Sequence, residues 1–513
     1  GIGSTRADFI LGLGRDRRRL IIILDLATVL AERDFLLSKN PGATIQQIDN
    51  GLLPRIGRPS ASYGNRDRIN LVGSLEWRPN DDVNFYVDGM YGYKKTDLIR
   101  EDIMWIVRNG AVIPLNTKYD KADCSTGCTV TSGTYANSQF FLEFRPYIEK
   151  TELWGINPGG EWRINDKLKF EAQANYTKSN FHRESPTFGP VTALGVGTTV
   201  DYTYNPNGPP TIKSSVDLNN PANFVWTGGR VNMQDEKRWY ETKGARGSVT
   251  WGDEALSLKF GANYDDISRT IRGYDNSGAW QNATCGNNPS INLSSPNSGP
   301  PCQGLNQPGA APAGYPTYPG YGTGATAGQT GTLTYGGSLI PTTSLASYLK
   351  PGPAGFVTVD WDKVKQATNY QALHDVYNES GGSNTGASGG YINEKNSSAY
   401  TELNGVTQVK DSDLRYNVGL RYVHTKQTIG GRVSLADPRN TLPGGAQLPD
   451  GARYPNITNF VYTENTYSKW LPAANIAYDV GEHAVARVAV SETMTRPDPA
   501  AQLPGVSFGA PSA

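Results

Sequence analysis

The stretch from Arg68 to Lys94 reads RINLVGSLEWRPNDDVNFYVDGMYGYK and contains one complete structural unit. From Ile69 to Trp77, apolar residues and glycine occupy every second position, and all but Val72 of the residues between them are polar. Pro79–Asp82 has the composition of a tight turn, and the alternation resumes from Val83. Because successive side chains of a strand point to opposite faces, this pattern predicts a β-hairpin with one apolar face.

The hairpin pattern recurs four more times, around turns at 164–167, 252–254, 406–412 and 481–482. An aromatic residue stands at the strand end just before the turn in four of the five units, at Trp77, Trp162, Trp251 and Tyr478. The turns within units are short. The connections between units are long and cover roughly 100–146, 182–236, 273–390 and 431–459.

This asymmetry predicts an all-β fold, an antiparallel transmembrane β-barrel with short periplasmic turns and long extracellular loops. About ten strands are expected between residues 68 and 496, each near the ten-residue length of a spanning strand. The four aromatic residues are expected to form a girdle at the periplasmic rim, where amphipathic rings settle at the headgroup level. The alternate, polar face is expected to line a wet or plugged lumen.

The composition agrees with thin β-structure. Only 37% of the 513 residues are hydrophobic, whereas the chain has 28 tyrosines, 10 tryptophans and 58 glycines. Lys+Arg and Asp+Glu both number 48, so there is no basic excess to indicate a nucleic-acid partner. No run of 18 apolar residues is present to indicate a transmembrane helix.

The four cysteines form two close pairs, Cys124 with Cys128 and Cys285 with Cys302, and turn residues flank them. Such spacing predicts two small disulfides in an oxidising compartment. A zinc site is the alternative, but the four histidines, at 182, 374, 424 and 483, are too scattered to complete one. We therefore expect neither a metal nor another cofactor.

No constellation of side chains indicates catalysis, so the chain is not expected to be an enzyme. Aromatic residues in the long connections are the candidates for contact with an extracellular ligand, since their faces stack on sugar rings or flat chelators. The alternative is that they pack their own loops into a compact cap. These residues are Trp226, Trp280, Tyr315, Tyr318 and Tyr321. Apolar residues at threefold spacing in 359–370 predict a short helix in the same connection.

The last part of the chain resembles a known family. YSKWLPAANIAYDV at 467–480 leads into ARVAVSETMTRP at 486–497, and NVGLRY precedes them at 417–422. Together with Glu394-Lys395, Ala399-Tyr400, FVTVDW at 356–361 and WRPNDD at 77–82, these segments resemble, in this order, the barrel of TonB-dependent receptors. The likeness is to a proteobacterial subfamily associated with oligosaccharide uptake.

The resemblance covers about residues 65–500 and implies active import of a scarce ligand across the outer membrane of a Gram-negative bacterium. An oligosaccharide is the expected ligand and an iron chelate the second. The implied partners are outer-membrane lipid, the extracellular ligand, and a TonB-type energy-transducing complex that docks through an N-terminal region not recognised here.

The chain departs from the family in three ways. No docking box is recognisable, and no plug is recognisable. The family barrel has 22 strands, whereas about ten are recognised in this sequence. Residues 1–64 remain unassigned, with Asp16–Lys39 either a helix or two strands, and 501–513 is expected to be a truncated tail. The sequence therefore predicts a partial barrel, from a fragment or an incomplete gene product.

A soluble β-sandwich or solenoid that binds sugars is the alternative, and it predicts that the Ile69/Leu71/Leu75 face packs on another sheet. A surface enzyme is third.

Overall fold

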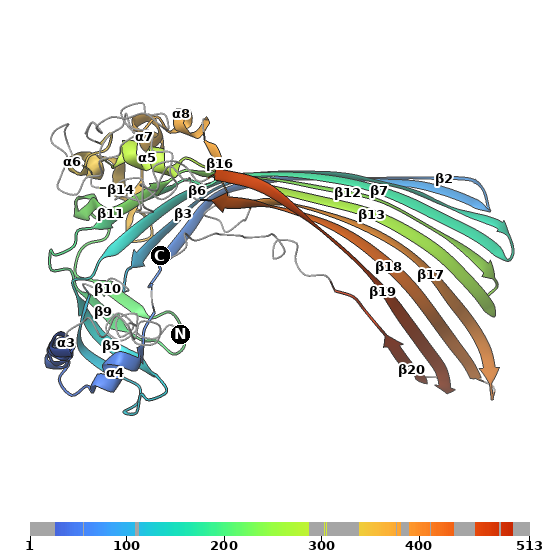
Figure 1. The fold of residues 1–513 in the computed structure, drawn as a ribbon, viewed down its shortest axis with the longest axis horizontal. Helices are drawn as coiled ribbons and strands as arrows, with labels where there is room; N and C mark the ends of the chain where they lie inside the picture. The colour runs from blue at the N-terminus through green and yellow to red at the C-terminus, as the bar shows by residue number, and fades with distance from the viewer. Residues whose placement is uncertain are drawn as a thin grey trace, which may run out of the picture.

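The structure is a computed structural model that describes residues 26–54, 56–107, 112–286, 302, 304, 338–375, 377–380, 389–410, 412–435, 457–481 and 484–495. Its largest element is an arched wall of ten long antiparallel strands, in the order β2-β3-β6-β7-β12-β13-β17-β18-β19-β20 (Figure 1). Their bounds are Ser60–Asn80, Val83–Trp105, Phe140–Asn165, Leu168–Glu184, Gln234–Gly252, Leu256–Asp275, Gly390–Val409, Ser412–Leu435, Ile457–Gly481 and Ala484–Ser491.

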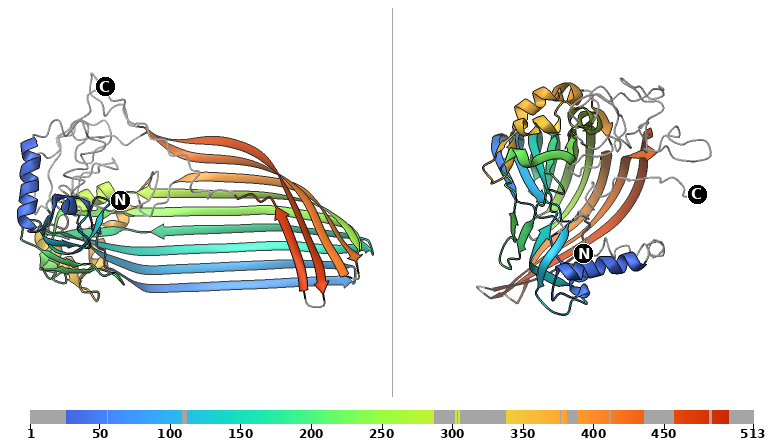
Figure 2. Two further views of the ribbon diagram at one scale, coloured as in Figure 1. Left: turned by 90° about the horizontal axis from the view of Figure 1, so that it is seen from below. Right: turned by 90° about the vertical axis from the view of Figure 1, so that its left-hand side faces the viewer.

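The predicted all-β, antiparallel class is confirmed, but the wall is an open sheet. Among the described residues, the edge strand β2 pairs with β3 and the other edge strand β20 pairs with β19. The two edges are not joined to each other in this part of the chain, and Figure 2 shows the sheet curved but not closed.

All five predicted turns lie at one end of the wall, and the four long connections leave from the other end (Figure 1). The strands themselves are longer than predicted. Nine of them have from 17 residues in β7 to 26 in β6, and only β20, with 8, is near the expected length. The sequence pattern had revealed only the half of each strand next to its short turn.

Along the paired strands β3 and β6, alternate side chains stay on the same face of the sheet from the turn to the cap. The pairing of β3 with β6 runs without a shift from Val83 opposite Trp162 to Trp105 opposite Phe140. Because side chains alternate between faces, every second residue from Val83 to Trp105 lies on the same face. We call the face that carries Trp77 and Trp162 the outer face, and the opposite one the inner face.

The described parts of three long connections, together with residues 26–54, fold into a cap at one end of the wall (Figure 1). One part is a small sheet of β1, β4, β5, β9 and β10, with α3 and α4 beside it. These elements span Gly51–Leu52, Ile113–Tyr119, Cys128–Ala136, Val200–Thr203, Thr211–Ser214, Leu26–Lys39 and Ile45–Asn50. The other part comprises β8 (Thr187–Thr192), η2 (Pro221–Asn223), β11 (Phe224–Asn232), α5 (Ser277–Thr284), α6 (Thr342–Leu345), η3 (Ala346–Tyr348), β14 (Leu349–Pro351), β15 (Val357–Val359), α7 (Trp361–Ala367), α8 (Tyr370–Asp375) and β16 (Asn378–Ser380).

Three local predictions can be compared with these elements. The helix expected in 359–370 is present as α7, and Asp360 caps it by accepting a hydrogen bond from the Lys363 amide. Within the unassigned segment 1–64, α3 answers the question left open for Asp16–Lys39 in favour of a helix, from residue 26 onward. The Asn40 side chain ties this helix to the cap by donating to the Pro114 carbonyl at 3.0 Å. Segment 501–513 lies outside the described residues.

No helix in the described part of the chain is long and apolar enough to cross a membrane.

Candidate functional site

The outer face of the wall carries an exposed apolar band along the half of each strand next to the short turns. Leu71 is 62% exposed, Leu75 71% and Val488 73% on the edge strands β2 and β20, and Phe260 is 54% exposed on β13, which is paired on both sides. A soluble monomer seldom leaves so large a continuous apolar surface uncovered. Other large apolar side chains of this band are Phe85, Val87, Ile156, Phe170, Val249, Leu403, Val418, Leu420 and Ile476.

A ring of aromatic side chains borders this band at the turn end. Trp77, Trp162 and Trp251 are exposed on the outer face of β2, β6 and β12, within three residues of their turns. Trp77 stacks on Phe85 of the next strand, with ring centroids 5.6 Å apart. Tyr478 occupies the matching place on β19, and its hydroxyl donates to the Val409 carbonyl at 3.2 Å.

A second aromatic ring, which the sequence analysis did not identify, borders the band on the cap side. Trp154 packs against Tyr176 with centroids 4.9 Å apart, and Tyr422 packs against Trp470 at 4.8 Å. Tyr93 and Tyr264 hold equivalent outer-face positions on β3 and β13. The signal was present in the sequence, because these residues continue the same alternation.

The distance between the two rings fits a bilayer. Trp154 and Trp162 are eight residues apart on β6, which is about 26 Å along the strand. With the usual barrel tilt of about 40°, the height is about 20 Å, near the ~25 Å apolar band of outer-membrane barrels. Beyond the second ring, the outer-face positions become charged, as at Lys95, Lys178 and Asp266.

The inner face is polar. A hollow of about 690 Å³ lies on it and is lined by residues of seven strands, so this face is the concave one. At its floor, Glu171 accepts hydrogen bonds from Lys259 at 2.8 Å and Ser248 at 3.1 Å, and Lys169 lies 2.9 Å away. The Tyr400 ring lies beside Gly261 of the neighbouring strand, where a Cβ would be only 2.4 Å from ring atoms. The inner face is thus polar and charged at this hollow.

Nearer the cap, the inner face carries a cluster of arginines around two buried carboxylates. Asp102 and Glu143 are paired across β3 and β6 and are almost fully buried. Arg58 lies 3.0 Å from Glu143, Arg230 3.2 Å from Glu143, and Arg100 3.0 Å from Asp102. Arg145 is a further partner of Glu143. Such burial is tolerated because each carboxylate has several charge-assisted partners.

The two predicted ligand-binding tryptophans that the structure describes lie in the core of the cap. Trp226 and Trp280 are both 0% exposed. Trp226 packs edge-on against Phe188 with centroids 5.0 Å apart, and its indole N–H donates to the Ile340 carbonyl at 2.8 Å. Both rings thus lie buried in the cap, the arrangement that the alternative expects, and neither presents an exposed face in this structure. Tyr315, Tyr318 and Tyr321 lie outside the described residues.

This core extends from the cap onto the wall. Trp105, Phe140 and Phe144 project from the outer face of β3 and β6 at their cap ends, where cap elements cover them. Trp280 packs against Tyr370 of α8 with centroids 5.2 Å apart, and Trp361 of α7 lies 5.2 Å from the same tyrosine. The outer face is thus apolar twice, once exposed beside the turns and once buried beneath the cap.

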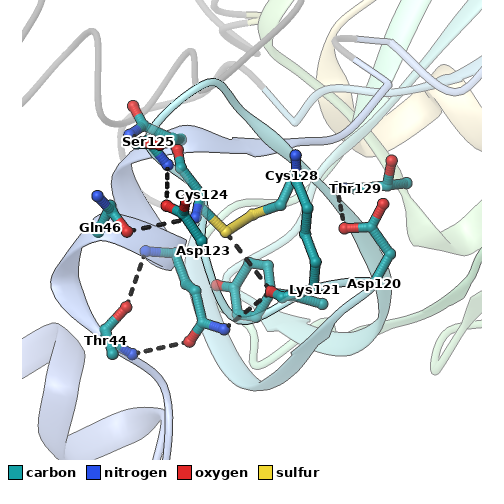
Figure 3. Close-up of a disulfide and its surroundings, with 12 residues drawn as sticks. Thr44, Gln46, Asp120, Lys121, Asp123, Cys124, Ser125, Cys128 and Thr129 are labelled. Atoms are coloured by element: carbon teal, nitrogen blue, oxygen red, sulfur yellow. Dashed lines mark hydrogen bonds between the residues drawn. A yellow bond between two sulfur atoms is a disulfide. The ribbon is translucent and has the colours of Figure 1, made fainter.

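Both cysteine pairs are joined in the structure, Cys124 to Cys128 and Cys285 to Cys302. The first disulfide lies against α4 (Figure 3), where the Gln46 side chain accepts a hydrogen bond from the Cys124 amide at 3.2 Å. Asn50 donates to the Cys124 carbonyl at 3.0 Å. The second disulfide is buried in the cap core. Both therefore brace the cap and not the wall.

Two of the four histidines converge on one carboxylate. The Nε2 atoms of His182 on β7 and His374 on α8 lie 2.6 Å and 3.0 Å from the same Asp235 oxygen. Burial alone would raise the pKa of the Asp235 carboxyl. The hydrogen bonds from His182 and His374 outweigh this effect, so the pKa of Asp235 lies below its ordinary value. For His374, the Asp235 hydrogen bond and the charge of Glu184 outweigh burial and raise the pKa.

The contacts of His182, His374 and Asp235 join α8 to the wall strands β7 and β12. The described residues contain no group of three or more side chains placed to hold a metal ion. His424 hydrogen-bonds with Ser468 at 2.9 Å on the outer face, and His483 lies outside the described residues.

Comparison with known proteins finds similarity only to solved structures, and at low sequence identity. No family model matches the chain, and no curated protein matches it. Among solved structures, the chain is similar to the closed form of the ferric-catecholate import receptor Fiu from E. coli K12, with a TM-score of 0.30 and 9% identity over 85% of this chain and 49% of that one. For the open form of the same receptor, the TM-score is 0.30, and the identity is 10% over 86% of this chain and 55% of that one. The chain thus spans about half the length of the structures that it matches.

Proposed function

We propose that this chain forms part of the wall of an outer-membrane β-barrel that imports a small ligand, of the TonB-dependent receptor class. The carrying observation is the exposed apolar band of the outer face, bordered by two aromatic rings. Its height, its aromatic borders and the charged residues beyond them match what a bilayer requires of a protein surface. The polar, charged inner face suits a lumen through which a hydrophilic ligand passes.

The barrel itself is part of the proposal. In a bilayer, every backbone N–H and C=O must be satisfied within the protein, so an open sheet edge is not viable in lipid. In the proposed barrel, the outer edges of β2 and β20 therefore pair with further strands. The resemblance of residues 65–500 to the receptor barrel supports this arrangement, since that barrel has 22 strands.

A prediction of the soluble sugar-binding alternative is not met among the described residues. This alternative predicts that the face of Ile69, Leu71 and Leu75 packs on another sheet. These side chains are 52%, 62% and 71% exposed, and no described element covers them. A soluble protein would leave this face in contact with water at a large free-energy cost.

The ligand is proposed at the level of its class. An oligosaccharide is the first candidate, by the resemblance of the late barrel strands, and an iron chelate is the second. We propose a transport role without catalysis, driven by a TonB-type complex. Equilibrium binding of oligosaccharides and of ferric chelates to the purified protein, measured side by side, distinguishes the two ligand classes.

The membrane assignment can be tested with two adjacent residues on β2. Leu71 and Val72 are both exposed apolar side chains, 62% and 83%, but they lie on the outer and inner faces respectively. Leu71→Arg should destabilise the protein in lipid vesicles by about 1–2 kcal/mol, because the charge would enter the apolar band close to its cap-side aromatic ring. Val72→Arg should change the stability by no more than about 0.5 kcal/mol, because its side chain meets water in the lumen.

The measurement is urea unfolding of both variants in lipid vesicles, followed by heat-modifiable migration in gels. Equal, small effects of the two substitutions would contradict a lipid-facing outer surface. A wild-type protein that stays soluble and monomeric without detergent would contradict the whole proposal.

A further inference from the structure

Five basic residues form a straight row across five neighbouring strands of the outer face, above the second aromatic ring. Lys95 is directly opposite Lys150, Lys150 opposite His182, His182 opposite Lys237, and Lys237 opposite Arg272. We call this set the basic row. Like charges directly opposite each other on adjacent strands repel, so the Lys95–Lys150 and Lys237–Arg272 pairs are unfavourable in the free wall. A row of this kind is favoured when an anion lies across it.

Carboxylates of the protein neutralise only part of the row. Asp235 is occupied by His182 and His374, and Glu379 lies 3.8 Å from Arg272. Within the described ranges, no carboxylate forms an ion pair with the other three members of the row. Lys95 is exposed, Lys150 lies over the Tyr93 ring at 5.6 Å, and Lys237 donates to the Tyr377 hydroxyl at 2.8 Å. These three lysines therefore form a positive patch without a direct ion pair, although the Glu152 carboxylate lies beside two of them.

A shallow pocket of about 190 Å³ opens in the middle of the row. Lys150, His182 and Lys237 line it, together with the half-exposed ring of Trp239. Glu152 also reaches the pocket, where it accepts a hydrogen bond from the Tyr91 hydroxyl at 3.4 Å. Cationic groups beside an exposed indole are suited to a sugar that carries phosphate, because phosphate pairs with the cations and the sugar face stacks on the ring.

The row climbs away from the apolar band. Lys95 stands two residues beyond Tyr93 of the second aromatic ring, whereas Arg272 stands eight residues beyond Tyr264. A flat phospholipid headgroup at the bilayer surface could reach only the lower end of such a row. A tall headgroup built of phosphorylated sugars could follow all of it.

We propose that the basic row binds the phosphorylated sugar headgroup of a glycolipid in the leaflet next to the cap. This inference rests on the proposed membrane location and adds to it a specific lipid partner. The row attracts the anionic headgroup, the pocket receives one sugar phosphate beside Trp239, and the aromatic ring below sets the depth of the acyl chains.

The test compares the triple variant Lys95→Gln/Lys150→Gln/Lys237→Gln with a matched control. The control, Lys121→Gln/Lys213→Gln/Lys350→Gln, removes the same charge from exposed lysines of the cap. Each full-length protein is purified in a zwitterionic detergent and titrated with lipopolysaccharide, with phosphatidylglycerol or with inorganic phosphate. Bound lipid is measured by native mass spectrometry.

We expect the wild-type protein and the control to retain lipopolysaccharide, and the row variant to bind it about tenfold or more weakly. Added salt should weaken wild-type binding. Phosphatidylglycerol and inorganic phosphate should bind weakly to all three proteins. Equal retention of lipopolysaccharide by the row variant and the control would overturn the proposal. Equally tight binding of phosphatidylglycerol or of inorganic phosphate would also overturn it, since a tall sugar headgroup would then be unnecessary.

Membrane insertion is measured in the same samples by heat-modifiable migration. If the wild-type protein inserts but the row variant loses no lipopolysaccharide, only this inference fails. If the wild-type protein does not insert into vesicles, the proposed function itself fails. A row variant that no longer inserts is replaced by Lys95→Gln/Lys150→Gln, which leaves the Lys237–Tyr377 hydrogen bond intact.

Discussion

The cap should be far more sensitive to the loss of Trp226 than a ligand-binding loop would be. Trp226→Ala removes a side chain that is 0% exposed, that packs on Phe188, and whose indole N–H is hydrogen-bonded to the Ile340 carbonyl at 2.8 Å. Burial of an aromatic ring of this size contributes about 5 kcal/mol, and part of that is recovered when the cavity relaxes. The lost hydrogen bond adds about 1 kcal/mol.

We therefore expect the free energy of unfolding of the cap to fall by about 4–5 kcal/mol in Trp226→Ala. Trp226→Phe keeps most of the ring and should cost about half as much, mainly through the unpaired Ile340 carbonyl. Val196→Ala is the control, because this cap side chain is 63% exposed, and its loss should change the stability by no more than about 0.5 kcal/mol.

The assay is amide hydrogen exchange of β11, which contains Trp226, and of α5, which contacts β11, together with ligand binding below the unfolding temperature. If Trp226→Ala abolished binding while exchange in β11 stayed at the wild-type rate, the indole would be a ligand contact and the core assignment would be wrong. Faster exchange confined to the cap, with the wall unchanged, is the result that the packing requires.

Three further perturbations have expected outcomes. Gly261→Ala should cost about 1–3 kcal/mol in urea unfolding because its Cβ displaces the adjacent tyrosine ring, whereas Gly419→Ala, which meets no atom closer than 3.6 Å, should be neutral. Cys124→Ser should destabilise the cap by about 2 kcal/mol and Cys285→Ser by about 3 kcal/mol, because the loop that the second disulfide closes is longer; non-reduced peptide mapping that finds free thiols in the wild type would contradict both. The raised pKa of His374 means that its contribution to stability is complete below the unfolded-state pKa and is lost as pH rises through the folded value. The protection of the α8 amides, measured relative to an unstructured peptide at each pH, should therefore decrease over that rise. Protection that stays constant over the same pH range would refute the role of this histidine.

The half of the wall next to the turns could be predicted from the sequence because one physical rule governs it. Where one face meets an apolar phase and the other meets water, side chains must alternate, and Ile69 to Trp77 show that alternation clearly. Turn composition supplied the register, so the five short turns and four long connections were predicted close to their observed places. The short helix α7 followed from its threefold apolar spacing.

The other half of each strand was missed because its outer face is no longer uniformly apolar. Past Tyr93, the outer positions of β3 continue as Lys95, Asp97, Ile99 and Glu101, which mixes charged and apolar residues. A strand of this composition has no periodic apolar face, and only its pairing with β6 shows that it continues. The strand length was therefore predicted only from the half of each strand that carries the exposed apolar band.

The role of the loop tryptophans could not be predicted for a different reason. Trp226 and Trp280 belong to connections with no periodicity, and their partners, such as Phe188 and Tyr370, are far away in the sequence. Nothing local distinguishes an aromatic residue that packs a cap from one that waits for a ligand. The basic row was equally hidden, because its members are adjacent only across strands.

The cap core also constrains the order in which the molecule can assemble. Trp105 and Tyr370 belong to the same cluster although about 265 residues separate them in the sequence. Closing a free chain of that length costs about 5 kcal/mol before any contact forms, whereas each short turn closes almost without cost. The wall hairpins should therefore zip first and bring the cap segments together, so that the core condenses last. Pulse-labelled hydrogen exchange during refolding should show protected wall amides before protected cap amides, and the reverse order would mean that the cap nucleates folding by itself.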